Sequence, residues 1–209
     1  MKFGLTFFIF SASALSATAA DESAATSSDL VASDGWNFIK DHTEYEMLER
    51  NFYPQGTKEA IECLSSTLQG KDDSNHQVKG FIHYRNLTTN EWVYVNQTYE
   101  FSQDSSGKYN VMNATAESQG PRGSQTFISI GQRCAGVSVV YSSTEVQASE
   151  SAPQERTISS QDTTTQCILW LEHGADLSDA QSCRNSLKTS CGGDFHTTYD
   201  KTSCASEAN

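Results

Sequence analysis

The chain has 209 residues, with 14 lysine or arginine residues and 26 aspartate or glutamate residues, so its formal net charge is -12 at pH 7. Nucleic acids and anionic membrane surfaces bind proteins through lysine and arginine, so this excess of acid argues against both as partners. The length suits a single domain with a substantial core.

The first twenty residues have the layout of a secretory signal peptide: Lys2, an apolar run from Phe7 to Leu15, then small residues up to Ala20. The run is too short to span a bilayer, so an uncleaved anchor helix is the less favoured alternative. We therefore expect 1–20 to be removed and the protein to be secreted to the extracellular space. Residues 21–33 are small and polar and predict a flexible leader, and 34–209 form the domain.

A short helix is predicted to open the domain, because Asp34 is a favourable N-cap and Trp36 and Ile39 lie on one helical face. From Tyr45 onward the apolar period changes to two, which is typical of strands. Turn sequences such as NLTTN separate these strands and predict an antiparallel meander closed into a barrel. The eight predicted strands are 45–53, 59–69, 77–86, 91–103, 107–117, 124–130, 134–142 and 164–172.

The last two strands are joined by the one long polar connection, 142–162, which we interpret as a loop over the barrel mouth. After them, Ser178 and Gln181 have the spacing of a capping box. This predicts a helix over 178–190, ended by the glycine pair 192–193 and packed against the outside of the barrel.

Six cysteines follow the predicted signal, and an even number in an oxidising compartment predicts three disulfides with fifteen conceivable pairings. A bond between Cys183 and Cys191 is excluded, because eight residues of helix separate them by roughly 12 Å. The five histidines are scattered and the sequence has no Cys-x-x-Cys motif, so no metal site is predicted. The cysteines are Cys63, Cys134, Cys167, Cys183, Cys191 and Cys204.

Three glycosylation sequons, at Asn86, Asn96 and Asn113, fit the same compartment. A glycan must point outward, and alternate strand residues face opposite sides of the barrel wall. A glycan on Asn113 would turn Met112, Ala114 and Ala116 inward. A glycan on Asn96 would place Trp92, Tyr94, Thr98 and Glu100 outside, and Val93, Val95, Gln97, Tyr99 and Phe101 inside.

The interior predicted in this way is largely apolar, which suits either a ligand cavity or a collapsed core without a ligand. We favour a cavity. Its expected lining is Phe52, Val93, Val95, Tyr99, Phe101, Met112, Ile168 and Trp170.

Three stretches carry a resemblance to a known family. They are Asp34-Gly35-Trp36 at the opening helix, Cys167-Ile168-Leu169-Trp170 in the last strand, and the series Cys183, Cys191, Tyr199, Cys204. In a chain with eight strands between two helices, they resemble the lipocalins, and more narrowly the salivary histamine-binding protein family of ticks. The resemblance implies an all-β fold, an eight-stranded antiparallel barrel with a short N-terminal helix and a C-terminal helix packed outside.

The resemblance also implies a disulfide pattern. The family's two core bonds correspond here to Cys63 with Cys204 and to Cys134 with Cys183. The remaining pair is then Cys167 with Cys191. This last bond would tie the final strand to the end of the C-terminal helix.

Relatives that bind biogenic amines carry Cys-Asp and Glu-Leu-Trp or Glu-Leu-Tyr, and the two acids pair with the ligand's ammonium. This chain has Ala135 and Ile168 at those places, so both acids are absent. The sequence therefore favours an apolar ligand such as a fatty acid, a leukotriene or a sterol over histamine or serotonin. A second amine site could draw on Glu49, Glu91 or Glu100, although solvated surface carboxylates are the favoured interpretation.

The leading hypothesis is a monomer that sequesters a small host inflammatory mediator without a cofactor or turnover. The alternative is an immune or complement modulator that binds host proteins through its outer loops, with Trp92 and Tyr94 exposed unless they pack beneath the C-terminal helix. An enzyme is the least favoured class, because no G-x-S-x-G elbow is present and Asp194-Phe195-His196 is interpreted as structural.

Overall fold

The computed structural model describes residues 34–53, 61–141 and 165–204. The predicted signal peptide, the leader 21–33 and the loop 142–162 lie outside these ranges and stay predictions. Between the described ends the elements, in chain order, are α1 (Gly35–Phe38), β1 (Glu44–Arg50), β2 (Ile61–Asp72), β3 (Gln77–Asn86), β4 (Glu91–Gln103), β5 (Tyr109–Ala114), β6 (Gly123–Ile130), β7 (Cys134–Tyr141), β8 (Cys167–Glu172), the 3-10 turn η2 (Leu177–Ala180), α2 (Gln181–Cys191), β9 (His196–Thr197) and α3 (Lys201–Cys204).

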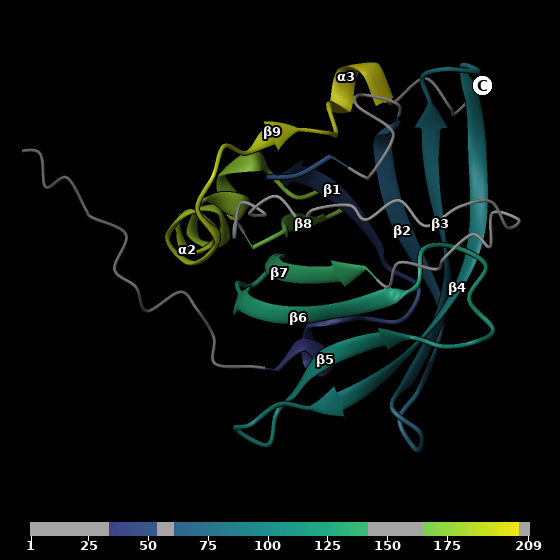
Figure 1. Ribbon diagram of the computed structural model, residues 1–209, viewed down its shortest axis with the longest axis vertical. Coiled ribbons are helices and arrows are strands. Elements are labelled where there is room, and N and C mark those ends of the chain that lie inside the picture. The colour runs from purple at the N-terminus through teal and green to yellow at the C-terminus, as the bar shows by residue number, and fades with distance from the viewer. Residues whose placement is uncertain (1–33, 54–60, 142–164, 205–209) are drawn as a thin grey trace, which may run out of the picture.

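Strands β1 to β8 form an antiparallel barrel in which each strand pairs with its neighbour in the chain (Figure 1). Strand β1 closes the barrel, because it pairs with β8 along one edge and with β2 along the other. The closing register places Tyr45 opposite Ser66. The predicted fold class is confirmed.

The C-terminal tail adds a short strand that the sequence did not indicate. Strand β9 pairs with the end of β1, where Arg50 lies opposite His196. The Cys63 amide then donates to the Thr198 carbonyl at 2.9 Å. The tail therefore bridges β1 and β2 beyond the point where their own pairing ends, and two residues are too few to show a strand period.

Helix α1 packs across the end of the barrel at which β1 begins. The Asp34 side chain accepts a hydrogen bond from the Asn37 amide at 2.9 Å, which confirms the predicted N-cap. The Tyr45 hydroxyl donates to the Phe38 carbonyl and accepts from the Lys40 amide, both at 3.0 Å. Burial raises the pKa of Tyr45 well above its usual value, so this hydroxyl stays protonated and holds α1 in place.

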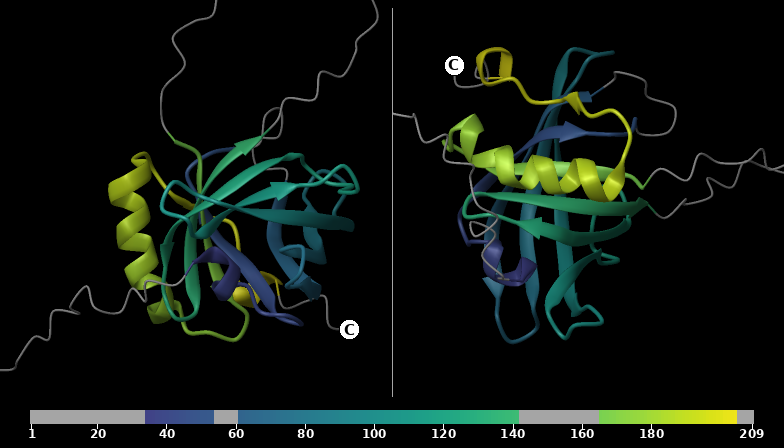
Figure 2. Two further views of the ribbon diagram at one scale, coloured as in Figure 1. Left: turned by 90° about the horizontal axis from the view of Figure 1, so that it is seen from below. Right: turned by 90° about the vertical axis from the view of Figure 1, so that its left-hand side faces the viewer.

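Helix α2 lies along the outside of the barrel over β6, β7 and β8, as Figure 2 shows. It ends at Gly192, which has a φ of 65°, as predicted. The predicted capping box of Ser178 and Gln181 was wrong. The N-cap is Asp176, two residues before Ser178, and its amide donates to the Asp179 carboxylate at 3.2 Å at the start of η2.

All three disulfides join the residues that the family resemblance implied. Cys134–Cys183 and Cys167–Cys191 tie the two ends of α2 to β7 and β8. Cys63–Cys204 ties the tail helix α3 to β2 across a sequence separation of 141 residues. Closure of such long loops stabilises a fold chiefly by restricting the unfolded chain.

The close approach of α2 to β7 depends on Gly136. A Cβ atom there would lie 2.6 Å from Leu187 Cγ and 2.5 Å from Ser129 Oγ. We expect Gly136→Val to lower the free energy of unfolding by about 2 kcal/mol, because α2 must shift to admit the side chain. Urea denaturation measures this loss. Gly70→Val on β2, where nothing lies within 4 Å, is the control, and an equal effect of both changes would contradict the packing argument.

Candidate ligand-binding site

Two apolar clusters lie on opposite sides of the barrel wall, and strand β8 contributes to both. Its Ile168 and Trp170 belong to the cluster inside the barrel. Its Cys167, Leu169 and Leu171 belong to the cluster between the wall and α2. This alternation makes the inner cluster the place where a ligand would be enclosed.

A cavity of about 40 Å³ lies within the inner cluster. A buried water needs roughly 10–15 Å³ of such space, whereas ligand pockets commonly measure about 300–1,000 Å³. The described interior is therefore filled mainly by side chains, and a larger ligand must displace some of them. The lining residues are Phe38, Ile39, Tyr45, Ser66, Leu68, Ile82, Tyr99, Met112, Gln125, Phe127 and Trp170.

The structure gathers three of the eight predicted lining residues at this cavity: Tyr99, Met112 and Trp170. Phe101 and Ile168 are buried in the same inner cluster without bordering the cavity. The others lie toward the opposite end of the barrel, where β1 and β7 finish.

Of these, Phe52 is buried, with its ring 5.9 Å from that of Tyr141. Val93 and Val95 are half-buried near the start of β4, away from the cavity. Ala116, which the parity argument turned inward, is exposed, because β5 ends at Ala114 and the alternation stops there.

Several lining residues escaped the sequence argument. Phe38 comes from the end of α1 and Ile39 is its C-cap, and no strand parity could place a helix across the barrel end. Gln125 and Phe127 face the cavity from β6, which carries no sequon to orient it. The spacing of two residues between Gln125 and Phe127 indicated that both side chains lie on one face of β6, but it did not indicate whether that face points inward.

The two positions at which amine-binding relatives would carry acids both face the interior. Ala135 is fully buried opposite Trp170, and Ile168 lies opposite Val137. No aspartate or glutamate is among the described residues that line the cavity.

The glutamates considered for a second amine site also lie outside the barrel. Glu49 accepts a hydrogen bond from Arg184 Nε of α2 at 2.9 Å, while Glu91 and Glu100 are exposed. The interpretation of these groups as surface carboxylates agrees with their positions.

Polar groups inside the barrel are few and incompletely paired. Gln97 is buried, and neither its Oε1 nor its Nε2 has a hydrogen-bond partner among the described residues. Gln125 bonds Tyr99, yet its Oε1 has no such partner. Burial raises the pKa of Tyr99, so its phenol remains a neutral hydrogen-bonding group.

A second pocket, of about 240 Å³, lies beneath the C-terminal tail. Arg50 and Tyr53 border it from the end of β1, and His196 borders it from β9. The His196 ring stacks on Tyr53 with centroids 4.2 Å apart and accepts a hydrogen bond from Arg50 Nε at 3.4 Å. Burial, and then the Arg50 charge, lower the pKa of His196 and favour its neutral form.

No catalytic arrangement emerges around the histidines. Among the described residues no serine bonds His196, in keeping with its structural interpretation. Ser65 Oγ lies 2.6 Å from Glu44 Oε1 and 2.9 Å from His83 Nε2, but Ser65 is fully buried. Glu44 Oε1 accepts the Ser65 hydrogen bond and also lies 3.8 Å from His83 Nε2, whereas the acid of a catalytic triad binds the histidine and not the serine.

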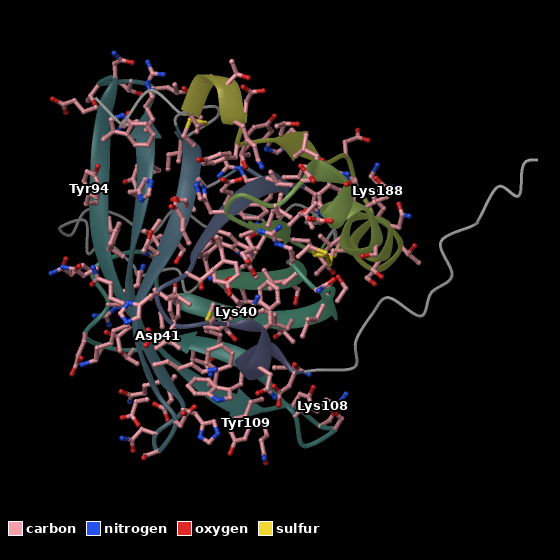
Figure 3. All side chains as sticks on the ribbon, turned by 180° about the vertical axis from the view of Figure 1, so that it is seen from behind. Lys40, Asp41, Tyr94, Lys108, Tyr109 and Lys188 are labelled. Carbon is pink, nitrogen blue, oxygen red and sulfur yellow. A yellow bond between two sulfur atoms is a disulfide. The ribbon has the colours of Figure 1, made fainter. Side chains whose placement is uncertain are left out.

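The outer wall of β3 and β4 carries an aromatic cluster formed by Phe81, His83, Trp92 and Tyr94, with neighbouring ring centroids 5.7–6.2 Å apart. The Tyr94 side chain is 59% exposed. Helix α2, which carries Lys188, lies on the other side of the barrel, as Figure 3 shows. Packing beneath that helix therefore does not account for Trp92 and Tyr94.

The three sequons lie on strands β3, β4 and β5. Asn96 is exposed on the outer wall opposite Phe81, and Asn86 and Asn113 are half-buried. Their glycosylation stays a prediction.

Within the described residues, no helix is long and apolar enough to cross a membrane. In the same ranges, no three metal-binding side chains come together.

Comparisons with known proteins place the chain among binding proteins. The family model described as tick histamine binding protein matches residues 24–206. A crustacyanin of the lobster Homarus americanus is similar in structure, with 8% sequence identity, a TM-score of 0.46, and coverage of 81% of this chain and 82% of the other. No curated protein matches the sequence.

The unpaired amide of Gln97 predicts a stabilising substitution. Gln97→Leu should raise the free energy of unfolding by about 1 kcal/mol, because a buried polar group without a partner is removed. Chemical denaturation of the disulfide-bonded protein without ligand measures the change. Gln103→Leu, at the exposed end of β4, should shift stability by less than about 0.5 kcal/mol. A clear loss of stability in Gln97→Leu would show that the amide is satisfied after all.

Proposed function

The chain belongs to the tick histamine-binding protein family, and from this membership we propose that it is a secreted lipocalin that sequesters a small, largely apolar mediator inside its barrel. The observation that carries the proposal is the inner cluster. Ala135 and Ile168 contribute only hydrocarbon at the two places where an amine would need carboxylates. Binding would be stoichiometric, without catalysis or a cofactor.

Charge is the physical reason to prefer an apolar ligand over a biogenic amine. An ammonium group that enters a water-excluded interior without a carboxylate loses several kcal/mol of hydration free energy. No described residue that lines the cavity supplies that carboxylate. Histamine and serotonin are therefore poor ligands for this interior, even though relatives bind such amines.

Ligand entry requires the filled interior to open. Met112 has three rotatable bonds and can move aside with little strain. Phe38 ends the short α1 and Ile39 is its C-cap, and the anchor of this segment to β1 includes the two hydrogen bonds of Tyr45. Each such bond contributes about 1 kcal/mol, which a ligand that buries a long hydrocarbon chain can offset.

Protein binding through the outer wall is the second candidate. The exposed aromatic cluster of β3 and β4 supports it, because aromatic side chains are enriched where proteins meet partners. On this alternative the chain would act as an immune or complement modulator, and the barrel interior would serve mainly as a core.

Native mass spectrometry of protein secreted from eukaryotic cells tests the proposed function. We expect a co-purified or added lipid from a panel of fatty acids, leukotrienes and sterols to bind at one molecule per chain, and histamine not to bind. Host serum proteins form a separate arm of the experiment. Saturable histamine binding at submicromolar concentration would contradict the apolar ligand, and serum binding without any lipid would favour the second candidate.

A cavity-filling variant links the binding to the interior. Ser66 lines the cavity, so Ser66→Leu should fill it and weaken lipid binding at least tenfold, while the unfolding temperature holds or rises. Thr67→Leu on the adjacent, outward-facing position is the matched control and should leave binding unchanged. Lipid fluorescence titration of the two variants measures the difference. Equal affinities would place the ligand outside the barrel.

A further inference from the structure

A buried arginine stands at the end of the barrel opposite α1. Arg50 is the last residue of β1, and it lies opposite Ile168, whose side chain belongs to the inner cluster. Only 3% of Arg50 is exposed. Because guanidinium groups remain charged in proteins, a positive charge is held almost out of contact with water at this point.

Arg50 has no carboxylate partner among the described residues, and of the four other described arginines only the exposed Arg122 shares this. Arg85, Arg133 and Arg184 each contact an aspartate or glutamate. Within the part of the chain that the structure describes, no carboxylate lies within ion-pair distance of Arg50, although the protein as a whole has a formal charge of -12. Among the described residues, the most buried guanidinium is thus left without a carboxylate.

The contacts that Arg50 does make leave most of its donors free. Its Nε donates to His196 Nε2, and one terminal nitrogen donates to the Ile61 carbonyl, each at 3.4 Å. The guanidinium also lies 6.0 Å from the Phe52 ring centroid. A guanidinium has five N–H donors, and two long hydrogen bonds to neutral acceptors neither use them all nor cancel the charge.

The neighbouring groups are neutral or donate hydrogen bonds. The depressed pKa of His196 keeps that ring neutral. Tyr53 and Tyr141 both lie close enough to interact electrostatically with Arg50, and their phenols can donate. Burial raises the pKa of Tyr141, so its hydroxyl keeps its proton.

Two carboxylates border the same pocket, but other groups already occupy them. Glu62 Oε1 accepts from Arg85 at 3.2 Å. Asp200 Oδ1 accepts from the Thr202 and Ser203 amides at the start of α3, at 3.0 and 2.9 Å. These hydrogen bonds lower the pKa of Asp200, as expected for a carboxylate held by backbone donors.

We propose that Arg50 binds the carboxylate of an amphipathic ligand whose hydrocarbon chain runs into the barrel, so that the ligand is a long-chain monocarboxylic acid. This rests on the proposed function, because it assigns one end of a ligand held inside the barrel. The pocket of about 240 Å³ beside Arg50 admits the acid group from solvent. Phe52 and Ile168 then lead from Arg50 toward the inner cluster.

The chemistry separates this ligand from the other apolar classes. A carboxylate can accept two parallel hydrogen bonds from one guanidinium, and such charge-assisted pairs are about twice as strong as neutral ones. A sterol, an alcohol or an ester can accept a hydrogen bond from the guanidinium but leaves its charge without a counter-ion, so it gains less than a carboxylate does. Selectivity for the free acid over its ester is therefore the direct signature of the site.

A conjugated polyene fatty acid that fluoresces on binding, and its methyl ester, are the probes for this test. The oxidised wild-type protein should bind the acid at least tenfold more tightly than the ester. Arg50→Gln should lose at least tenfold in affinity for the acid and keep its affinity for the ester within twofold. Arg122→Gln is the matched control, because Arg122 is exposed next to Gly123 at the same end of the barrel, does not border the pocket, and should change neither affinity.

Each alternative outcome is distinguishable. Equal binding of acid and ester by the wild type, or an unaffected acid affinity in Arg50→Gln, overturns the carboxylate site and leaves the proposed function standing. Binding of neither probe, with no lipid found by mass spectrometry, overturns the proposed function itself. Acetate that binds as tightly as the long-chain acid overturns the placement of the chain in the barrel. If Arg50→Gln does not fold, the acid and ester affinities of the wild type decide alone.

Discussion

Closure of the sheet through β1 is the constraint on which the rest of the structure depends. Because β1 pairs with β8 and with β2, the eight strands have an inward face that surrounds the inner cluster and an outward face that meets solvent, α2 or the C-terminal tail. The pairing also fixes the orientation of β1 itself. One strand thereby delivers Tyr45 to the α1 end of the interior and Arg50 to the opposite end.

The interior has a charge pattern opposite to that of an amine site. Ala135 and Ile168 supply hydrocarbon where amine-binding relatives would place acids, and Arg50 supplies a buried cation that no described carboxylate neutralises. Because the interior is apolar, a ligand charge that finds no partner there recovers little of its hydration free energy.

The C-terminal tail contributes to the site as well as to stability. The Cys63–Cys204 bond and the pairing of β9 with β1 hold His196 against Arg50 and Tyr53. The tail thereby forms one wall of the pocket beside Arg50. The two-residue strand β9 is defined by its pairing with β1 and is followed by the hydrogen bond between Thr198 and Cys63, so no local sequence pattern could indicate it.

The sequence by itself determined the strand periodicity, the Asp34 cap and the Gly192 helix end, because each is a property of neighbouring residues or of a short motif. The absence of both amine-pairing acids could be recognised only by comparison with the family. The family resemblance added the disulfide pairs. Only the tertiary structure decided that Phe38 and Ile39 fill the cavity, that Val93 and Val95 lie away from it, and that Arg50 is buried without an acid. Those facts depend on which distant segments close over a side chain, and burial is a property of the closed barrel that no stretch of sequence contains.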